Sequence, residues 1–331
     1  MKKIILVLCL VALCLFSGCQ KKPEHAHCVC TNALEGHLCT ETEWQPLTQA
    51  MFTEATSDTK PVWLDKDNTI YRIQDGDYYL TEDIVISKQI VYTGVKLQLC
   101  INGKKLTAEN NRVCAISGST LKICDCQYGT EGYDGCIAGG TTEKGGAFLL
   151  QGREGGTNGE LADLTLYSGV IKGGNTPEGS TGFGGAIWIY GGNLSMYGGE
   201  LIGGNVSGYG GVVAVDKDQG VNIYGGKITS GTADYAPGLY MAPNSQISIG
   251  GKVQIEDIYL GEACVLTVPQ ELPLEEPANN IGITMAVPGV FLKNLRSDHA
   301  DFFFSTDPAY SIGFDNKTKS QMLVSAEESA N

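Results

Sequence analysis

A dense group of candidate metal ligands lies near the N-terminus, in the stretch HAHCVCTNALEGHLC that begins at residue 25. Thiolate and imidazole groups are the ligands that zinc prefers, and a structural site needs four of them. The stretch therefore predicts a structural zinc site, and no other cofactor is expected. Two alternatives stay open: a disulfide within the stretch, or a segment whose thiols bind nothing. The six candidate ligands are His25, His27, Cys28, Cys30, His37 and Cys39.

Four further cysteines occupy related positions later in the chain. Cys100 ends the segment LQLC and Cys124 ends LKIC, and the two segments align. Because aligned residues are expected in neighbouring strands, these two thiols could approach disulfide distance. Cys126 and Cys136 could close the loop between them in the same way. The alternative is that these cysteines are small buried apolar residues.

Carboxylate pairs are a second source of chemistry, because most glycoside hydrolases use two carboxyl groups roughly 5–10 Å apart. Asp216 and Asp218 are the weak catalytic candidates of this kind. In neighbouring repeats the equivalents of Asp216 are Tyr190 and Ala242, so no column of carboxylates forms. The two aspartates are therefore expected to be solvated turn residues. The sequence also lacks a phosphate-binding loop and a nucleophile elbow.

Aromatic residues recur at regular spacing, and exposed rows of them can stack on sugar rings or anchor a protein partner. The alternative is a ladder of rings that only stabilises the sheet. The sequence predicts a ligand-binding surface formed by Trp188, Tyr240 and Leu149 in one row and by Tyr167, Tyr197 and Tyr224 in another.

Internal repeats must position all of these residues. GGAIWIYGG starts at Gly184 and GGVVAVDKD at Gly210, so equivalent residues are 26 apart. A second motif alternates with the first and reads LTLYSGVIKGG from Leu164 and LSMYGGELIGG from Leu194. Apolar residues alternate with period two in both motifs, as in strands. Glycines between the strands allow tight corners and close approach of neighbouring backbones.

The repeats align residues into columns. A column with a large apolar residue in every repeat is predicted to point inward, toward the core. A column whose residue varies from repeat to repeat is predicted to point outward, toward solvent. We expect four inward columns: Ile187, Val213 and Leu239; Ile189, Val215 and Met241; Leu166, Met196, Ile223 and Ile249; and Ile171, Leu201, Ile228 and Val253. The column of Leu149, Trp188, Ala214 and Tyr240 is expected to face outward.

The segments GGAIWI, LSMYGGELIGGN and LKICDC resemble those of right-handed parallel β-helix proteins of the pectate-lyase-like (pectin lyase-like) type, and specifically glycine-rich bacterial surface proteins. The resemblance spans residues 78–285. It implies an all-β, right-handed parallel β-helix solenoid with coils of about 26–30 residues and a C-terminal cap. One scaffold carries many activities, so the resemblance does not fix a function.

The first nineteen residues read MKKIILVLCLVALCLFSGC and predict an export signal. Two lysines precede an apolar run that is too short to span a bilayer. Phe-Ser-Gly-Cys resembles the bacterial lipobox, which implies a lipoprotein whose Cys19 is lipidated and anchors the protein in the membrane. The alternative is an ordinary signal peptide. The net charge of −14 excludes nucleic acid as a partner.

These features predict five segments. Residues 1–18 are a lipoprotein signal peptide and residues 19–24 a lipidated tether. Residues 25–77 are a Cys/His-rich segment leading into the β-helix, residues 78–288 the β-helix itself, and residues 289–331 a C-terminal cap and tail.

Three functions fit this organisation. The first is a non-catalytic, adhesin-like protein at the bacterial cell surface that binds a polysaccharide or a host surface protein. The second is a polysaccharide lyase or glycoside hydrolase on the same scaffold. The third is a purely structural surface spacer. The lack of a carboxylate or Lys/Arg column favours the first over the second.

Overall fold

The computed structural model describes residues 25–27, 42–56, 69–94, 96–152, 161–269, 274–275, 280–293 and 301–326. The predicted signal peptide and Cys19 lie outside the described residues, as do Cys28, Cys30, His37, Cys39 and the side chain of His27. None of the helices described is long and apolar enough to cross a membrane.

Nearly all regular structure in the described residues is β-strand. The short 3-10 helix η1 spans Gln49–Met51. The first strands are β1 (Ala26–His27), β2 (Thr42–Glu43), β3 (Gln45–Leu47), β4 (Thr53–Thr56), β5 (Thr69–Arg72), β6 (Gly76–Leu80), β7 (Ile84–Ile86), β8 (Ile90–Thr93), β9 (Lys96–Cys100) and β10 (Lys105–Ala108). The middle strands are β11 (Cys114–Ser117), β12 (Thr120–Cys124), β13 (Cys136–Ala138), β14 (Phe148–Gln151), β15 (Ala162–Leu166), β16 (Val170–Lys172), β17 (Gly182–Phe183), β18 (Ile187–Ile189), β19 (Gly192–Met196), β20 (Glu200–Ile202) and β21 (Gly208–Tyr209). The last strands are β22 (Val213–Val215), β23 (Gly220–Thr229), β24 (Leu239–Met241), β25 (Gln246–Leu260), β26 (Val265–Thr267), β27 (Ile281–Met285), β28 (Val290–Leu292), β29 (Phe303–Ser305), β30 (Tyr310–Asp315) and β31 (Ser320–Ser325).

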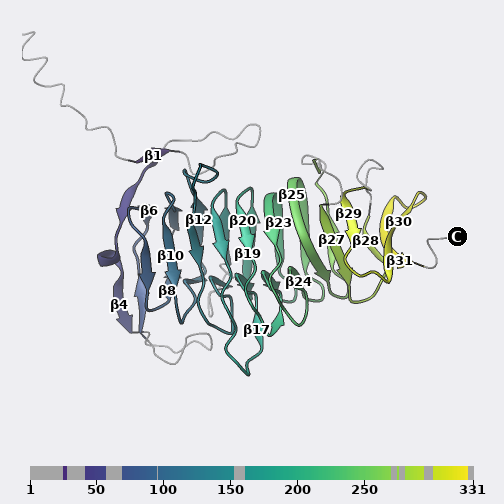
Figure 1. Ribbon diagram of the computed structural model, residues 1–331, viewed down its shortest axis with the longest axis horizontal. Helices are drawn as coiled ribbons and strands as arrows, with labels where there is room; N and C mark the ends of the chain where they lie inside the picture. Colours follow the sequence, from purple (N-terminus) through teal and green to yellow (C-terminus); the bar gives the residue numbers. More distant parts are fainter. Residues whose placement is uncertain are drawn as a thin grey trace, which may run out of the picture.

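The described strands form a long sheet of 27 strands in which most pairs are parallel. Figure 1 shows the strands side by side along the long axis of the molecule, from β4 and β6 at one end to β30 and β31 at the other. Parallel neighbours need a crossover between them, and here each crossover contains further strands of the same sheet. The expected all-β class and the long, mostly parallel sheet are confirmed, and the topology is compatible with a β-helix.

The inward columns form the core. Ile187 pairs with Val213 and Val213 with Leu239, and these side chains are buried. Leu166 pairs with Met196 in the second motif, and Met196 with Ile223. Equivalent apolar residues therefore stack in register over successive strands, where each covers the next and removes it from water.

One expected column is wrong at its last member. Ile228 pairs with Ile255 and not with Val253, which lies opposite Gly226. The register between β23 and β25 shifts after Ile223, because β25 carries one extra residue there. A bulge of this kind inserts a residue without breaking the ladder, and a fixed spacing read from the sequence cannot anticipate it.

A column of glycines, defined here as Gly140, Gly174, Gly204 and Gly231, lines one corner of the molecule. A Cβ on Gly174 would collide with the carbonyl oxygen of Gly140, and one on Gly204 with that of Gly174. Neighbouring backbones thus approach so closely at this corner that a side chain has no room. This answers why the repeats contain paired glycines: the corner needs the missing Cβ.

The two ends of the described parallel sheet differ. At the C-terminal end β29 pairs in parallel with β27, and the antiparallel pair β30–β31 follows, with β31 also antiparallel to β28. At the other end β3 pairs in parallel with β6.

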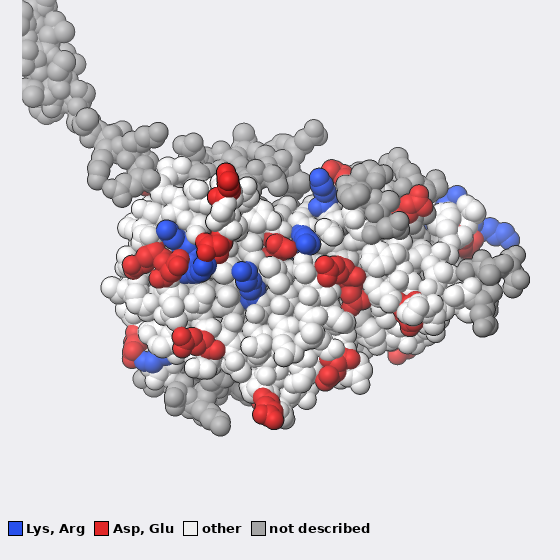
Figure 2. Space-filling view, viewed as in Figure 1, with Lys and Arg blue, Asp and Glu red and all other residues white. Residues whose placement is uncertain are grey.

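Figure 2 shows Lys and Arg side chains interspersed among Asp and Glu on one face of the molecule, without a large area of either sign.

Candidate functional site

Two outward rows of aromatic side chains run beside each other across successive strands. The first row contains Phe183 at the end of β17, Tyr209 at the end of β21 and Tyr235. The second contains Trp188 in β18, with Ala214, Tyr240 and Tyr259 at the paired positions of β22, β24 and β25. We call Phe183, Trp188, Tyr209, Tyr235, Tyr240 and Tyr259 the aromatic surface.

Ring contacts join the two rows. Ring centroids are 5.4 Å apart for Phe183 and Tyr209 and 4.9 Å apart for Tyr209 and Tyr235, and both pairs are stacked. Phe183 also stacks on Trp188 at 5.4 Å, and Tyr209 contacts Tyr240 at 4.8 Å. These spacings follow from the strand separation of about 4.8 Å, which places equivalent rings at stacking distance.

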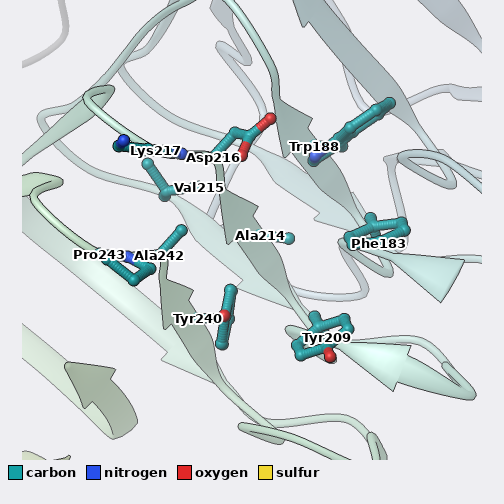
Figure 3. A pocket seen from close by; sticks show the side chains of 10 residues that line it. All are labelled: Phe183, Trp188, Tyr209, Ala214, Val215, Asp216, Lys217, Tyr240, Ala242 and Pro243. Carbon is teal, nitrogen blue, oxygen red and sulfur yellow. Dashed lines mark hydrogen bonds between the residues drawn. The ribbon is translucent and has the colours of Figure 1, made fainter. Parts of the chain in front are cut away.

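A groove opens where the second row is interrupted. Ala214 lies between Trp188 and Tyr240, so a methyl group replaces a ring at that level (Figure 3). Trp188 and Tyr240 are two strand spacings apart, which is about 10 Å. The cavity there has a volume of about 420 Å³ and is lined by Phe183, Trp188, Tyr209, Ala214, Val215, Asp216, Lys217, Tyr240, Ala242 and Pro243.

The polar groups of the groove sit at its rim. Asp216 and Lys217 lie across the groove from Phe183 and Tyr209 (Figure 3). The Lys144 ammonium lies 5.5 Å from the centre of the Trp188 ring, a cation–π contact. Burial raises the pKa of Tyr240, so its phenol stays protonated and can donate a hydrogen bond at neutral pH. The groove thus combines flat apolar walls with a few hydrogen-bonding groups.

The two catalytic candidates are not placed alike. Asp216 is half-buried and lines the groove, where its Oδ1 accepts a hydrogen bond of 2.8 Å from the Lys217 backbone N–H. Asp218 is exposed and has a φ of 62°, as a turn residue does. Among the described residues that line the groove, Asp216 is the single carboxylate. A hydrolase pair is therefore not assembled by these residues.

No protein-family model, curated protein or solved structure matches the chain. Its function therefore has to be inferred from its own residues.

The other residues predicted to bind a ligand do not line the groove. Leu149 pairs with Trp188 as expected, but it is fully buried in a second apolar cluster with Ile70, Val91 and Ala115. The expectation that this column faces solvent is wrong for Leu149 and for Ala214, which are both buried.

The tyrosine row forms a ladder away from the lining of the groove. Tyr167 stacks on Tyr197 with ring centroids 5.4 Å apart, and Tyr197 contacts Tyr224 at 5.7 Å. The Tyr224 hydroxyl lies 3.2 Å from Ser248 Oγ. These rings pack mainly on one another, so they offer less free surface than the groove does.

Sequence reasoning missed Phe183, Tyr209, Tyr235 and Tyr259. The sequence does carry a signal for the first three, because these aromatic residues are 26 apart. Two of them precede the paired glycines of GFGG and GYGG, and the third precedes the Ala-Pro-Gly of YAPG. Tyr259 carries no such signal, because it follows Tyr240 by only 19 residues: β25 continues without a break from Ile255 to Ile258, where a loop separates β23 from β24 in the preceding repeat.

Two buried carboxylates lie outside the groove lining. Asp125 accepts hydrogen bonds from the Gly103 backbone N–H at 3.0 Å and from the Tyr133 hydroxyl at 2.9 Å. Asp257 accepts hydrogen bonds from the hydroxyls of Thr284 and Thr306, at 3.2 and 3.0 Å. Burial raises the pKa of Asp257, although these hydrogen bonds oppose the change. Both carboxylates hold neighbouring turns together, which is a structural task.

Asp257→Asn is expected to raise the melting temperature by a few degrees at pH 7 and to leave it unchanged at pH 3. Since folding raises the pKa of Asp257, its contribution to stability is complete below the ordinary value of 3.8 and is lost as the pH rises through the folded-state value. Asparagine stays neutral, and its carbonyl oxygen can still accept from both threonines. Thermal unfolding of both proteins at the two pH values measures the effect, and a stabilisation that is equal at both values would contradict it.

Of the four cysteines predicted to form disulfides, Cys100, Cys124 and Cys126 lie close together, and Cys136 lies in another strand. Cys100 pairs with Cys124 in β9 and β12, as expected, and both are buried. The Cys100 thiol lies 3.7 Å from that of Cys126. A hydrogen bond with Cys124 raises the pKa of Cys100. Cys136 lies in β13, opposite Lys105 of β10. The predicted pairing of Cys126 with Cys136 stays a prediction.

Proposed function

We propose that this protein is a non-catalytic, lipid-anchored protein of the bacterial cell surface that binds a polysaccharide in the groove of its aromatic surface. The scaffold is a right-handed, pectate-lyase-like β-helix with coils of about 26–30 residues. The lipobox-like segment before Cys19 supports the anchor. The observation that carries the binding function is the groove between Trp188 and Tyr240.

The width of the groove suits one sugar ring. Carbon atoms in contact are about 3.5–4.0 Å apart, so a ring held between two others needs roughly 7–8 Å between their planes. The separation of about 10 Å between Trp188 and Tyr240 gives that room, with Ala214 as the floor. A pyranose presents C–H groups on its faces to the rings and hydroxyls at its edge to Asp216 and Lys217.

The length of the surface suits a chain of sugars. Trp188, Ala214, Tyr240 and Tyr259 lie on four successive paired strands, which extends the row over about 14 Å. Tyr240 stacks on Tyr259 with ring centroids 5.5 Å apart, so no sugar ring enters between those two. A polysaccharide with one unit in the groove lays its neighbouring units over the outer edges of the flanking rings, and weak contacts at several levels add up.

The charge of the groove favours a neutral polymer. Asp216 and Lys217 carry opposite charges at its rim, and the whole chain has a net charge of −14. An acidic polysaccharide would be repelled by the protein as a whole. A neutral one avoids this repulsion and binds through stacking and hydrogen bonds.

The deciding experiment incubates the purified full chain with a panel of neutral and acidic polysaccharides and measures two quantities. The first is retention of the protein on each polymer, and the second is release of reducing or unsaturated chain ends. Retention on a neutral polymer without new chain ends is the expected result. New chain ends would instead support an enzyme, and retention on none would leave a protein partner or a spacer role.

A further inference from the structure

Residues far apart in the sequence meet on the outer face near the N-terminal end of the sheet. His25 precedes β1, Cys100 ends β9, and Cys126 follows β12. Their ligand atoms all lie within 4.8 Å of one another. Cys100 is buried, His25 is half-buried and Cys126 is exposed, so the cluster opens to solvent on the side of Cys126.

Two of the three distances within this cluster are close to those of a tetrahedral zinc site. With Zn–S bonds of about 2.3 Å and Zn–N bonds of about 2.0–2.1 Å, two sulfur ligands lie about 3.8 Å apart, and a sulfur and a nitrogen about 3.6 Å apart. The Sγ atoms of Cys100 and Cys126 are 3.7 Å apart, and Cys126 Sγ lies 3.9 Å from His25 Nε2. The ligand atoms of His25 and Cys100 lie within 4.8 Å of each other, so this pair must close up for one metal ion to contact all three residues.

Neighbouring groups hold the cluster in place. The His25 ring stacks on Tyr79 with centroids 4.3 Å apart and an angle of 7° between the planes, and its edge meets Trp44. The Gln127 side chain donates a hydrogen bond of 3.7 Å to Cys126 Sγ. Such contacts orient the ligands.

We propose that His25, Cys100 and Cys126 bind one Zn²⁺ ion, which fastens the N-terminal segment to the sheet. Binding forms two Zn–S bonds and one Zn–N bond and releases the two thiol protons to solvent, without oxidation or reduction. A water molecule completes the tetrahedron. This site shares only His25 with the six ligands expected from the sequence, and it does not depend on the polysaccharide proposal.

The test titrates the reduced, purified full chain with Zn²⁺ and with Co²⁺ as a spectroscopic substitute. We expect one Zn²⁺ per chain by native mass spectrometry and a thiolate-to-Co²⁺ charge-transfer band. Cys126→Ser and His25→Gln are each expected to weaken Zn²⁺ binding at least about tenfold. Because Cys126 is exposed, its substitution leaves the core intact, and circular dichroism checks the fold of each variant.

Cys264→Ser is the matched control, since it removes a half-buried thiol outside the cluster. It is expected to bind Zn²⁺ like the unaltered chain. Unchanged binding in Cys126→Ser and His25→Gln would overturn the proposal, because the metal would then be held elsewhere. Failure of the reduced chain to bind Zn²⁺, or a Cys100–Cys126 disulfide that forms even with Zn²⁺ present, would overturn it as well.

Discussion

Replacing Gly174 with alanine is expected to lower the free energy of unfolding by about 3 kcal/mol or more. A Cβ at this position would collide with the carbonyl oxygen of Gly140, and backbone atoms cannot turn aside as a side chain can. The corner must therefore open, which separates strands on both sides of it. The midpoint of urea unfolding, followed by circular dichroism, measures the loss.

Gly289→Ala is the matched control for this prediction. No atom lies within 4 Å of a Cβ built at Gly289, and its backbone needs no positive φ. The same chemical change should therefore alter the midpoint very little. If both variants unfold at the same urea concentration, close packing at the glycine column is not what requires glycine there.

Ala214→Trp is expected to abolish retention on the polysaccharide, and Trp188→Ala to weaken the affinity about 10–30-fold. The first change fills the gap between Trp188 and Tyr240 with a third ring, and the second removes one wall. Trp188 also packs against the buried cluster around Leu149, so its loss can affect stability. Ala214 is itself buried, so circular dichroism checks the fold of both variants. Retention on the neutral polymer, measured as a binding isotherm, gives both effects.

Tyr197→Ala controls for the loss of a stacked ring in general. Tyr197 stacks on Tyr167, contacts Tyr224 at a tilt and does not line the groove. Its substitution is expected to leave the affinity unchanged. Should Tyr197→Ala weaken retention while Ala214→Trp does not, the binding surface would be the tyrosine row and the groove assignment would be wrong.

The core could be predicted from the sequence wherever one spacing persists. Ile187, Val213 and Leu239 keep both the period of a strand and the spacing of the repeat, and they stack as expected. The same reasoning misplaces Val253, since a bulge changes the local count. The repeat spacing therefore identifies the paired residues of neighbouring strands only where successive repeats have the same number of residues.

The candidate sites were harder to predict because they depend on what covers a residue. Trp188 and Leu149 occupy equivalent positions, yet Trp188 lines a groove and Leu149 is fully buried in an apolar cluster. The contact of His25 with Cys126 joins residues 101 positions apart. No periodicity relates those two, so only the folded chain brings them together.

Because inward and outward residues alternate along each strand, substitutions in the outer row are separate from substitutions in the interior. Ile187, Val213 and Leu239 hold the interior, while their sequence neighbours Trp188, Ala214 and Tyr240 form the outer row. Substitutions in the outer row can alter what the groove accepts, one level at a time, and the interior need not adjust. Under the proposed function, a lineage carrying this scaffold can therefore change its ligand while its architecture stays constant.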